Sequence, residues 1–170
     1  IRFQYMDAPV IMAINGTAAG GGFSLALSGD YIIASDKAKF VSAYTASGLT
    51  PDGSSTYFLA KHVGLLRAKE LFLTNKMLSA EEAKQWGFVN EVVAHDDLTI
   101  KSEELASQLA SGPTKAYGGV KRMLLSSFSS PIESQLDNET RHIVGTMETH
   151  DGPHGLNAFL NKEKPRFTGS

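Results

Sequence analysis

The first part of the chain alternates short apolar runs with glycine and turn residues, which predicts strands joined by a short helix. Residues 10–14 form a continuous apolar run, typical of a strand buried on both faces. Residues 31–35 predict a second strand, and residues 38–41 predict a third across a turn at Asp36-Lys37. Residues 23–27 predict a short buried helix that Gly29 ends. Strand, helix, strand in this order indicates a right-handed βαβ unit.

The middle of the chain carries clearer boundary signals. Residues 46–56 are rich in Gly, Ser, Thr, Pro and Asp and predict a loop, followed by helices at about 54–62 and 65–73. In LSAEEAKQWG, Ser79 is a candidate N-cap, Glu82 follows three residues later and Gly87 ends the helix. Residues 88–94 predict another strand.

From Asp97 onward the pattern is helical. Leu98, Leu105 and Leu109 share one face of a first helix, and Pro113 opens a second that extends to about Ser127. A third, amphipathic helix is marked by Ile132, Leu136, Ile143 and Met147, and residues 155–167 close the chain. We therefore expect an α/β portion over residues 1–95 and a helical tail over residues 96–170.

Composition narrows the class of protein. The 170 residues are 42% hydrophobic and 20% charged, as in globular proteins, and the net charge of −2 gives no basic footprint for nucleic acid. The apolar runs are too short to span a membrane. The absence of cysteine excludes disulfides and thiolate metal sites and suggests a reducing compartment. We expect a cytoplasmic protein, with a mitochondrial or peroxisomal location left open, and a chain that starts at Ile1 as part of a longer one.

Three consecutive glycines, Gly20, Gly21 and Gly22, stand directly before the first predicted helix. A helix start presents unpaired N–H groups and partial positive charge, and missing side chains let a ligand approach them. Phosphates and oxygens that become anionic during a reaction use such groups. The spacing excludes the dinucleotide fingerprint and the P-loop. A tight strand-to-helix packing contact is the alternative explanation.

The segment APVIMAINGTAAGGGFSLALSGDYIIAS resembles the central part of the crotonase family, the enoyl-CoA hydratase/isomerase superfamily. LFLTNKMLSAEEAKQWGFVNEVV and the ending GLNAFLNKEKPRFTG are similar to later parts of the same family, in the same order. The resemblance implies the crotonase ββα superhelix with a helical trimerisation region. It also implies that an N-terminal part of the fold precedes this sequence.

The resemblance gives the glycines a role. Family members hold the thioester oxygen of an acyl-CoA with two backbone N–H groups, and Gly21 matches one of them, with Gly20 and Gly22 lining the same place. The second donor belongs to the preceding part of the fold. Hydratases of the family also use two glutamates, and here Ser24 and Tyr44 stand at those positions. Neither can act as a carboxylate base toward water, which argues against ordinary hydration.

Asp52, in GLTPDGSST, stands where isomerase-type members carry a carboxylate. The resemblance implies that it removes a proton at C2 of an enoyl-CoA and returns it at C4. Members acting on the ring-epoxide or oxepin form of phenylacetyl-CoA have a similar Pro-Asp segment. Four alternatives stay open: Asp52 is only a helix N-cap, it is the nucleophile of a dehalogenase, hydration uses residues from elsewhere, or the protein binds acyl-CoA without catalysis. Asp30 is expected to be a structural hydrogen-bond acceptor.

The remaining candidates concern binding and assembly. Ser24 is expected to contact the substrate beside the glycines. Tyr44 is expected either to line the acyl pocket as a donor or to pack there, and Phe159 and Lys162 match the region that contacts the CoA phosphates and adenine. The resemblance implies a homotrimer or a dimer of trimers, with coenzyme A as part of the substrate and no other cofactor. The histidines lack metal-site spacing, and Gly152-Pro153 is expected to break the helix that would align His150 with His154. No G-x-S-x-G nucleophile elbow occurs.

Overall fold

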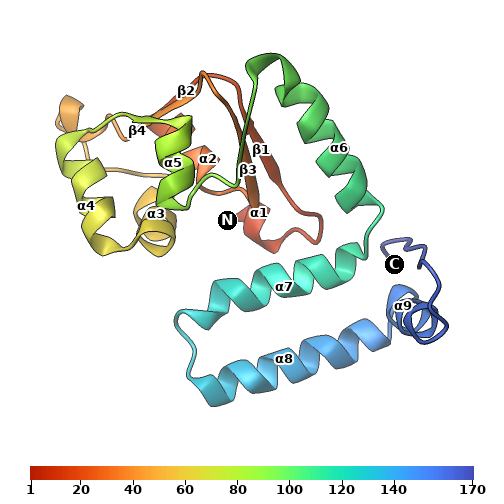
Figure 1. The fold of residues 1–170 in the computed structure, drawn as a ribbon. Coiled ribbons are helices and arrows are strands. Elements are labelled where there is room, and N and C mark those ends of the chain that lie inside the picture. Colours follow the sequence, from red (N-terminus) through yellow and green to blue (C-terminus); the bar gives the residue numbers. More distant parts are fainter. The chain divides into compact units, whose positions relative to one another are not determined.

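A computed structural model describes all 170 residues of the chain, shown as a ribbon in Figure 1. Val10–Glu103 forms one compact unit. Ile1–Pro9 and Glu104–Ser170 together form the other. The helix α6 (Leu98–Ala110) contributes residues to both. No helix is long and apolar enough to cross a membrane.

One sheet of the Val10–Glu103 unit contains the parallel strands β1 (Ile11–Ile14), β3 (Tyr31–Ser35) and β6 (Glu91–Val93), in the order β1-β3-β6. The predictions of β1 and β3 are confirmed. The strand predicted over residues 88–94 is shorter than expected, because β6 covers only Glu91–Val93. The expectation that the first strand is buried on both faces is wrong for this chain. Ala13 is exposed and the other β1 residues are half-buried, so β1 is covered only in part within this chain.

A second small sheet leads into the glycine turn. It joins β2 (Thr17–Ala19) in parallel to β4 (Lys39–Val41), which pairs antiparallel with β5 (Leu78–Ser79). The predicted strand and turn around β4 are confirmed, but β2 and β5 were not predicted. Both are too short to show an alternating pattern, and each depends on pairing with β4.

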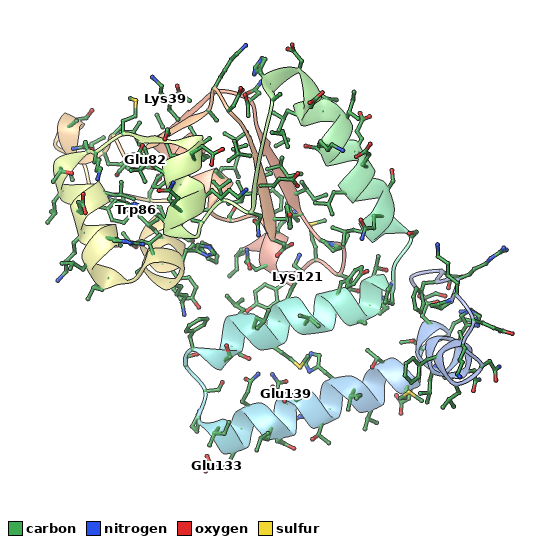
Figure 2. All side chains as sticks on the ribbon, in the orientation of Figure 1. Lys39, Glu82, Trp86, Lys121, Glu133 and Glu139 are labelled. Atoms are coloured by element: carbon green, nitrogen blue, oxygen red, sulfur yellow. The ribbon has the colours of Figure 1, made fainter.

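Helices in the Val10–Glu103 unit follow the predicted boundaries closely. The short helix after the glycines begins earlier than expected, at Gly21, and Leu25 on it is exposed. The capped helix after Ser79 carries Glu82 and Trp86 (Figure 2). The helical elements before α6 are α2 (Gly21–Ala26), η1 (Thr45–Ser47), α3 (Ser55–Val63), α4 (Leu65–Thr74), α5 (Ala80–Trp86) and η2 (His95–Asp97).

Three aromatic rings hold α2 against β4 and the segment after α5. Phe23, Phe40 and Phe88 are buried and meet edge to face, with ring centroids between 5.4 and 6.5 Å apart. Edge-to-face contacts add roughly 0.5–1.5 kcal/mol each to the burial of the rings. This cluster fixes the start of α2, and with it the glycine turn.

The other unit contains α1 (Arg2–Tyr5), α7 (Thr114–Ser127), α8 (Ile132–Met147) and α9 (Asp151–Leu160). Pro113 is the N-cap of α7, as predicted, and α7 and α8 lie side by side (Figure 1). The apolar residues that marked the third helix are exposed on α8: Ile132, Leu136, Ile143 and Met147.

The start of α9 corrects one expectation. Gly152-Pro153 does not break the helix, because Pro153 lies in its first turn, where a backbone N–H has no intrahelical partner to lose. The rings of His150 and His154 therefore stack, with centroids 5.8 Å apart and an angle of 19° between the planes. No group of three or more potential metal ligands lies together.

Candidate active site

Gly20 makes the turn between β2 and α2. Its φ of +52° and ψ of −122° belong to a region that favours glycine. Its N–H donates to the carbonyl oxygens of Val41, at 3.3 Å, and Ser42, at 3.1 Å. These bonds tie the turn to the end of β4.

Gly21 and Gly22 differ from Gly20 in the reason for having no side chain. A Cβ atom at either position would meet nothing within 4 Å, so close packing does not require glycine there. The alternative explanation of the glycines, a tight strand-to-helix packing contact, is therefore wrong for Gly21 and Gly22. Both residues are exposed, and they are the first two residues of α2, where backbone N–H groups have no intrahelical acceptor. The arrangement suits a ligand that approaches the main chain.

A chain of hydroxyl groups connects α2 to the loop before α3. Ser24, which is 1% exposed, has its Oγ 3.0 Å from Oη of Tyr44. Tyr44 Oη donates to Oδ1 of Asp52 at 2.5 Å. Three residues predicted for the site, 8 to 28 positions apart in the sequence, thus form one connected group.

Asp52 does not cap α3, so the N-cap interpretation is wrong. The N-cap of α3 is Ser54, which makes no side-chain capping bond. The main-chain carbonyl of Asp52, not its carboxylate, accepts from N and Oγ of Ser55, at 3.2 and 2.9 Å. The exposed carboxylate remains available for chemistry, oriented by Tyr44.

The loop between Asp52 and α3 is held in an unusual conformation that the sequence analysis missed. Gly53 and Ser54 have φ of +61° and +69°. A Cβ at Gly53 would lie 2.8 Å from Cβ of Ser24. The loop therefore packs directly on Ser24. The Asp-Gly pair was the available signal, since it favours positive φ.

Partial burial raises the pKa of the Tyr44 phenol, and the hydrogen bond to Asp52 raises it further, while the contact with Ser24 acts in the opposite direction. A phenol with a raised pKa keeps its proton at neutral pH. Tyr44 therefore acts as a donor to the Asp52 carboxylate.

The other predicted residues are not members of this hydrogen-bonded group. Asp30 accepts the N–H of Val10 at its Oδ2, at 2.8 Å, which confirms its structural role. Phe159, on α9, is 77% exposed, and Lys162 is exposed just after that helix. Both belong to the unit that contains α7–α9. Their contact with a ligand remains a prediction.

The sequence model of the enoyl-CoA hydratase/isomerase family matches residues 2–170. The chain belongs to this family. It is 40% identical over 168 residues to the 1,2-epoxyphenylacetyl-CoA isomerase of Escherichia coli K12, covering 99% of this chain and 64% of that protein. It is 35% identical to 4-chlorobenzoyl coenzyme A dehalogenase-1 of an Arthrobacter species, covering 93% of this chain and 57% of the relative.

A solved enoyl-CoA hydratase subunit I from Geobacillus kaustophilus has the same fold. The TM-score is 0.94 at 37% identity, and the alignment covers 99% of this chain and 66% of that one. This similarity confirms the α/β crotonase fold. The chain spans about two thirds or less of the length of these relatives. The relatives are named for different reactions, so family membership alone does not fix the chemistry.

Proposed function

We propose that the protein is an acyl-CoA enzyme of the isomerase type, in which Asp52 moves a proton while the thioester becomes an enolate. The observation that carries this proposal is the position of the Asp52 carboxylate. It is hydrogen-bonded to Tyr44, which contacts α2 through Ser24, and it takes no part in capping α3. An exposed carboxylate linked to a bare glycine turn is what this chemistry needs.

The proposed reaction uses one carboxylate and no water. Asp52 removes a proton from C2 of a β,γ-unsaturated acyl-CoA, and the electrons move into the thioester carbonyl to give a dienolate. The same carboxylic acid then protonates C4, which leaves an α,β-double bond. The N–H of Gly21 is the proposed donor to the enolate oxygen, with Gly20 and Gly22 leaving the approach clear. One such donor contributes roughly 2.7–4 kcal/mol to transition-state stabilisation.

Hydration is the less favoured reaction because it needs a group to activate water and an acid to protonate the α-carbon. The resemblance assigns these tasks to the positions of Ser24 and Tyr44. Both side chains are hydroxyls, and their contacts connect them to each other and to Asp52. A hydroxyl whose pKa is raised, as in Tyr44, is a poor base at neutral pH.

Two relatives favour specific variants of the proposal. The 40% identical relative is a 1,2-epoxyphenylacetyl-CoA isomerase, which supports a ring substrate as one candidate for the same Asp52 chemistry. The 35% identical dehalogenase supports a second candidate function, in which Asp52 attacks an aryl carbon as a nucleophile and chloride leaves. Water then hydrolyses the aryl ester on Asp52 and restores the carboxylate. We propose Phe159 and Lys162 as contacts for coenzyme A. The proposed assembly is a homotrimer or a dimer of trimers, and light scattering would measure its mass.

The decisive experiment compares the wild-type protein with Asp52→Asn on β,γ-enoyl-CoA substrates. We expect kcat/KM to fall by about 10²- to 10⁴-fold, the usual contribution of a general acid or base, while the dissociation constant for a non-reacting acyl-CoA stays within about twofold, since the CoA contacts remain. Asp96→Asn, an exposed carboxylate in η2, is the matched control with unchanged turnover.

Undiminished turnover in Asp52→Asn would remove Asp52 from the reaction. Dehalogenation is tested separately, by mass spectrometry of the protein after incubation with 4-chlorobenzoyl-CoA. An acyl-aryl adduct on Asp52 supports the nucleophilic role. Exchange of the α-protons of a saturated acyl-CoA with deuterated solvent, lost in Asp52→Asn, supports enolate formation.

A further inference from the structure

The hydroxyls of Tyr44 and Ser24 form an ordered series that ends on Asp52. Tyr44 has one proton, and its 2.5 Å contact with Oδ1 of the carboxylate uses it. The phenol oxygen can then only accept from Ser24, whose Oγ lies 3.0 Å away. The alternative acceptor for Ser24, the carbonyl oxygen of Gly20, is farther away at 3.3 Å. The protons therefore point from Ser24 to Tyr44 to Asp52, and such series strengthen the last bond.

We propose that Tyr44, held by Ser24, is a positioning residue that fixes Oδ1 of Asp52, so that Oδ2 is the oxygen that carries the proton between C2 and C4. This inference rests on the proposed function and assigns Tyr44 and Ser24 a task other than binding substrate. Because the phenol is committed to Asp52, it is not the donor to the acyl group that the sequence suggested as one possibility.

Packing supports the same assignment. Gly53 follows Asp52 directly and has a φ of +61°, and a Cβ there would come within 2.8 Å of Cβ of Ser24. Ser24 is also buried. A side chain as long as glutamate at position 24 would have to displace this loop. The loop that presents Asp52 and a carboxylate at position 24 therefore compete for one space, so Ser24 favours chemistry by Asp52 over the two-glutamate arrangement.

The test uses Tyr44→Phe and Ser24→Ala in the whole protein, with Tyr57→Phe on α3 as the matched control. We expect Tyr44→Phe to lower kcat by about 10- to 100-fold, the range for one hydrogen bond to a charged group, with KM within about twofold. Ser24→Ala should lower kcat less, by roughly threefold to tenfold. Tyr57→Phe should match the wild type.

The separate changes in kcat and KM distinguish positioning from substrate binding. A positioning role lowers kcat in Tyr44→Phe and leaves KM within about twofold, whereas Tyr57→Phe changes neither value. A rise in KM with kcat unchanged would overturn the positioning role and make Tyr44 a substrate contact.

A readout without turnover keeps this inference distinct from the proposed function. Burial raises the pKa of Tyr44, and the hydrogen bond to Asp52 and the negative charge of Asp52 raise it further. The pKa of Tyr44 should therefore fall in Asp52→Asn, as followed by NMR of ¹³Cζ-labelled tyrosine. An unchanged Tyr44 pKa would refute the contact itself. If the pKa falls but Asp52→Asn keeps its turnover, the contact is present and the proposed function fails.

Discussion

The helices α5 and α3 each begin directly after a serine, yet the two starts are built in opposite ways. At α5, Ser79 has an extended backbone, its Oγ accepts the N–H of Glu82 at 3.3 Å, and Oε2 of Glu82 accepts the N–H of Ser79 at 2.8 Å. At α3, Ser54 has a φ of +69° and makes no capping bond. The first start follows the rules for a stable helix.

The difference indicates that the start of α3 meets a requirement other than helix stability. A nearby carboxylate, Asp52, was available to cap α3, as Glu82 contributes to the cap of α5. It is instead bonded to Tyr44, and two successive residues with positive φ, Gly53 and Ser54, accommodate that direction. Strained backbone and a missing cap within one loop are typical of functional sites. The comparison supports Asp52 as the reacting group without reference to relatives.

The largest expected effect comes from Gly53→Ala. A residue other than glycine at positive φ costs about 1–2 kcal/mol, and the added Cβ would press on Ser24. We expect the free energy of unfolding to fall by about 2 kcal/mol in urea titrations and kcat to fall because Asp52 moves. Gly16→Ala, where a Cβ meets nothing within 4 Å and φ is not positive, is the control and should change the free energy of unfolding by less than about 1 kcal/mol. Equal stability of the two variants would mean that position 53 does not require glycine.

Removing one hydroxyl at each helix start is the next test. Ser79→Ala should lower the free energy of unfolding by about 1 kcal/mol, because a capping bond is lost. Ser54→Ala should change it by less than about 0.5 kcal/mol, because Ser54 makes no such bond and is exposed. Chemical denaturation of both variants measures the difference. If the two serines prove equally important, the contrast between α5 and α3 is lost.

The two starts also explain what the sequence could and could not predict. The capping box at Ser79 and the end of α5 at Gly87 depend on residues within ten positions, so the pattern predicted both correctly. Short strands such as β2 and β5 depend on pairing with a distant strand and were missed. At α9, the proline rule was applied without its exception for the first turn.

The candidate site shows the same limit. From the residues alone, PDGSS favours a helix cap at Asp52, and only the resemblance to the crotonase family favours Asp52 as a base. The hydrogen bonds from Ser24 to Tyr44 and onward span 20 and 8 positions. The positions of these side chains depend on the φ angles of Gly20 and Gly53. Glycine permits such angles, but its presence in a sequence does not predict them.

The smallest expected effect is a pH dependence confined to the start of α5. Hydrogen bonds from the backbone N–H and the hydroxyl of Ser79 lower the pKa of Glu82 below its usual value of 4.5. A carboxylate with a lowered pKa stabilises the folded state above the unfolded pKa, and this contribution is lost as the pH falls through the folded value. The difference in free energy of unfolding between wild type and Glu82→Gln should therefore be largest near neutral pH and shrink below pH 4.5. Glutamine can also form a capping box, so Glu82→Gln removes the charge and keeps the cap. A difference that stays constant from pH 7 to pH 3 would show that the charge of Glu82 contributes nothing to this helix start.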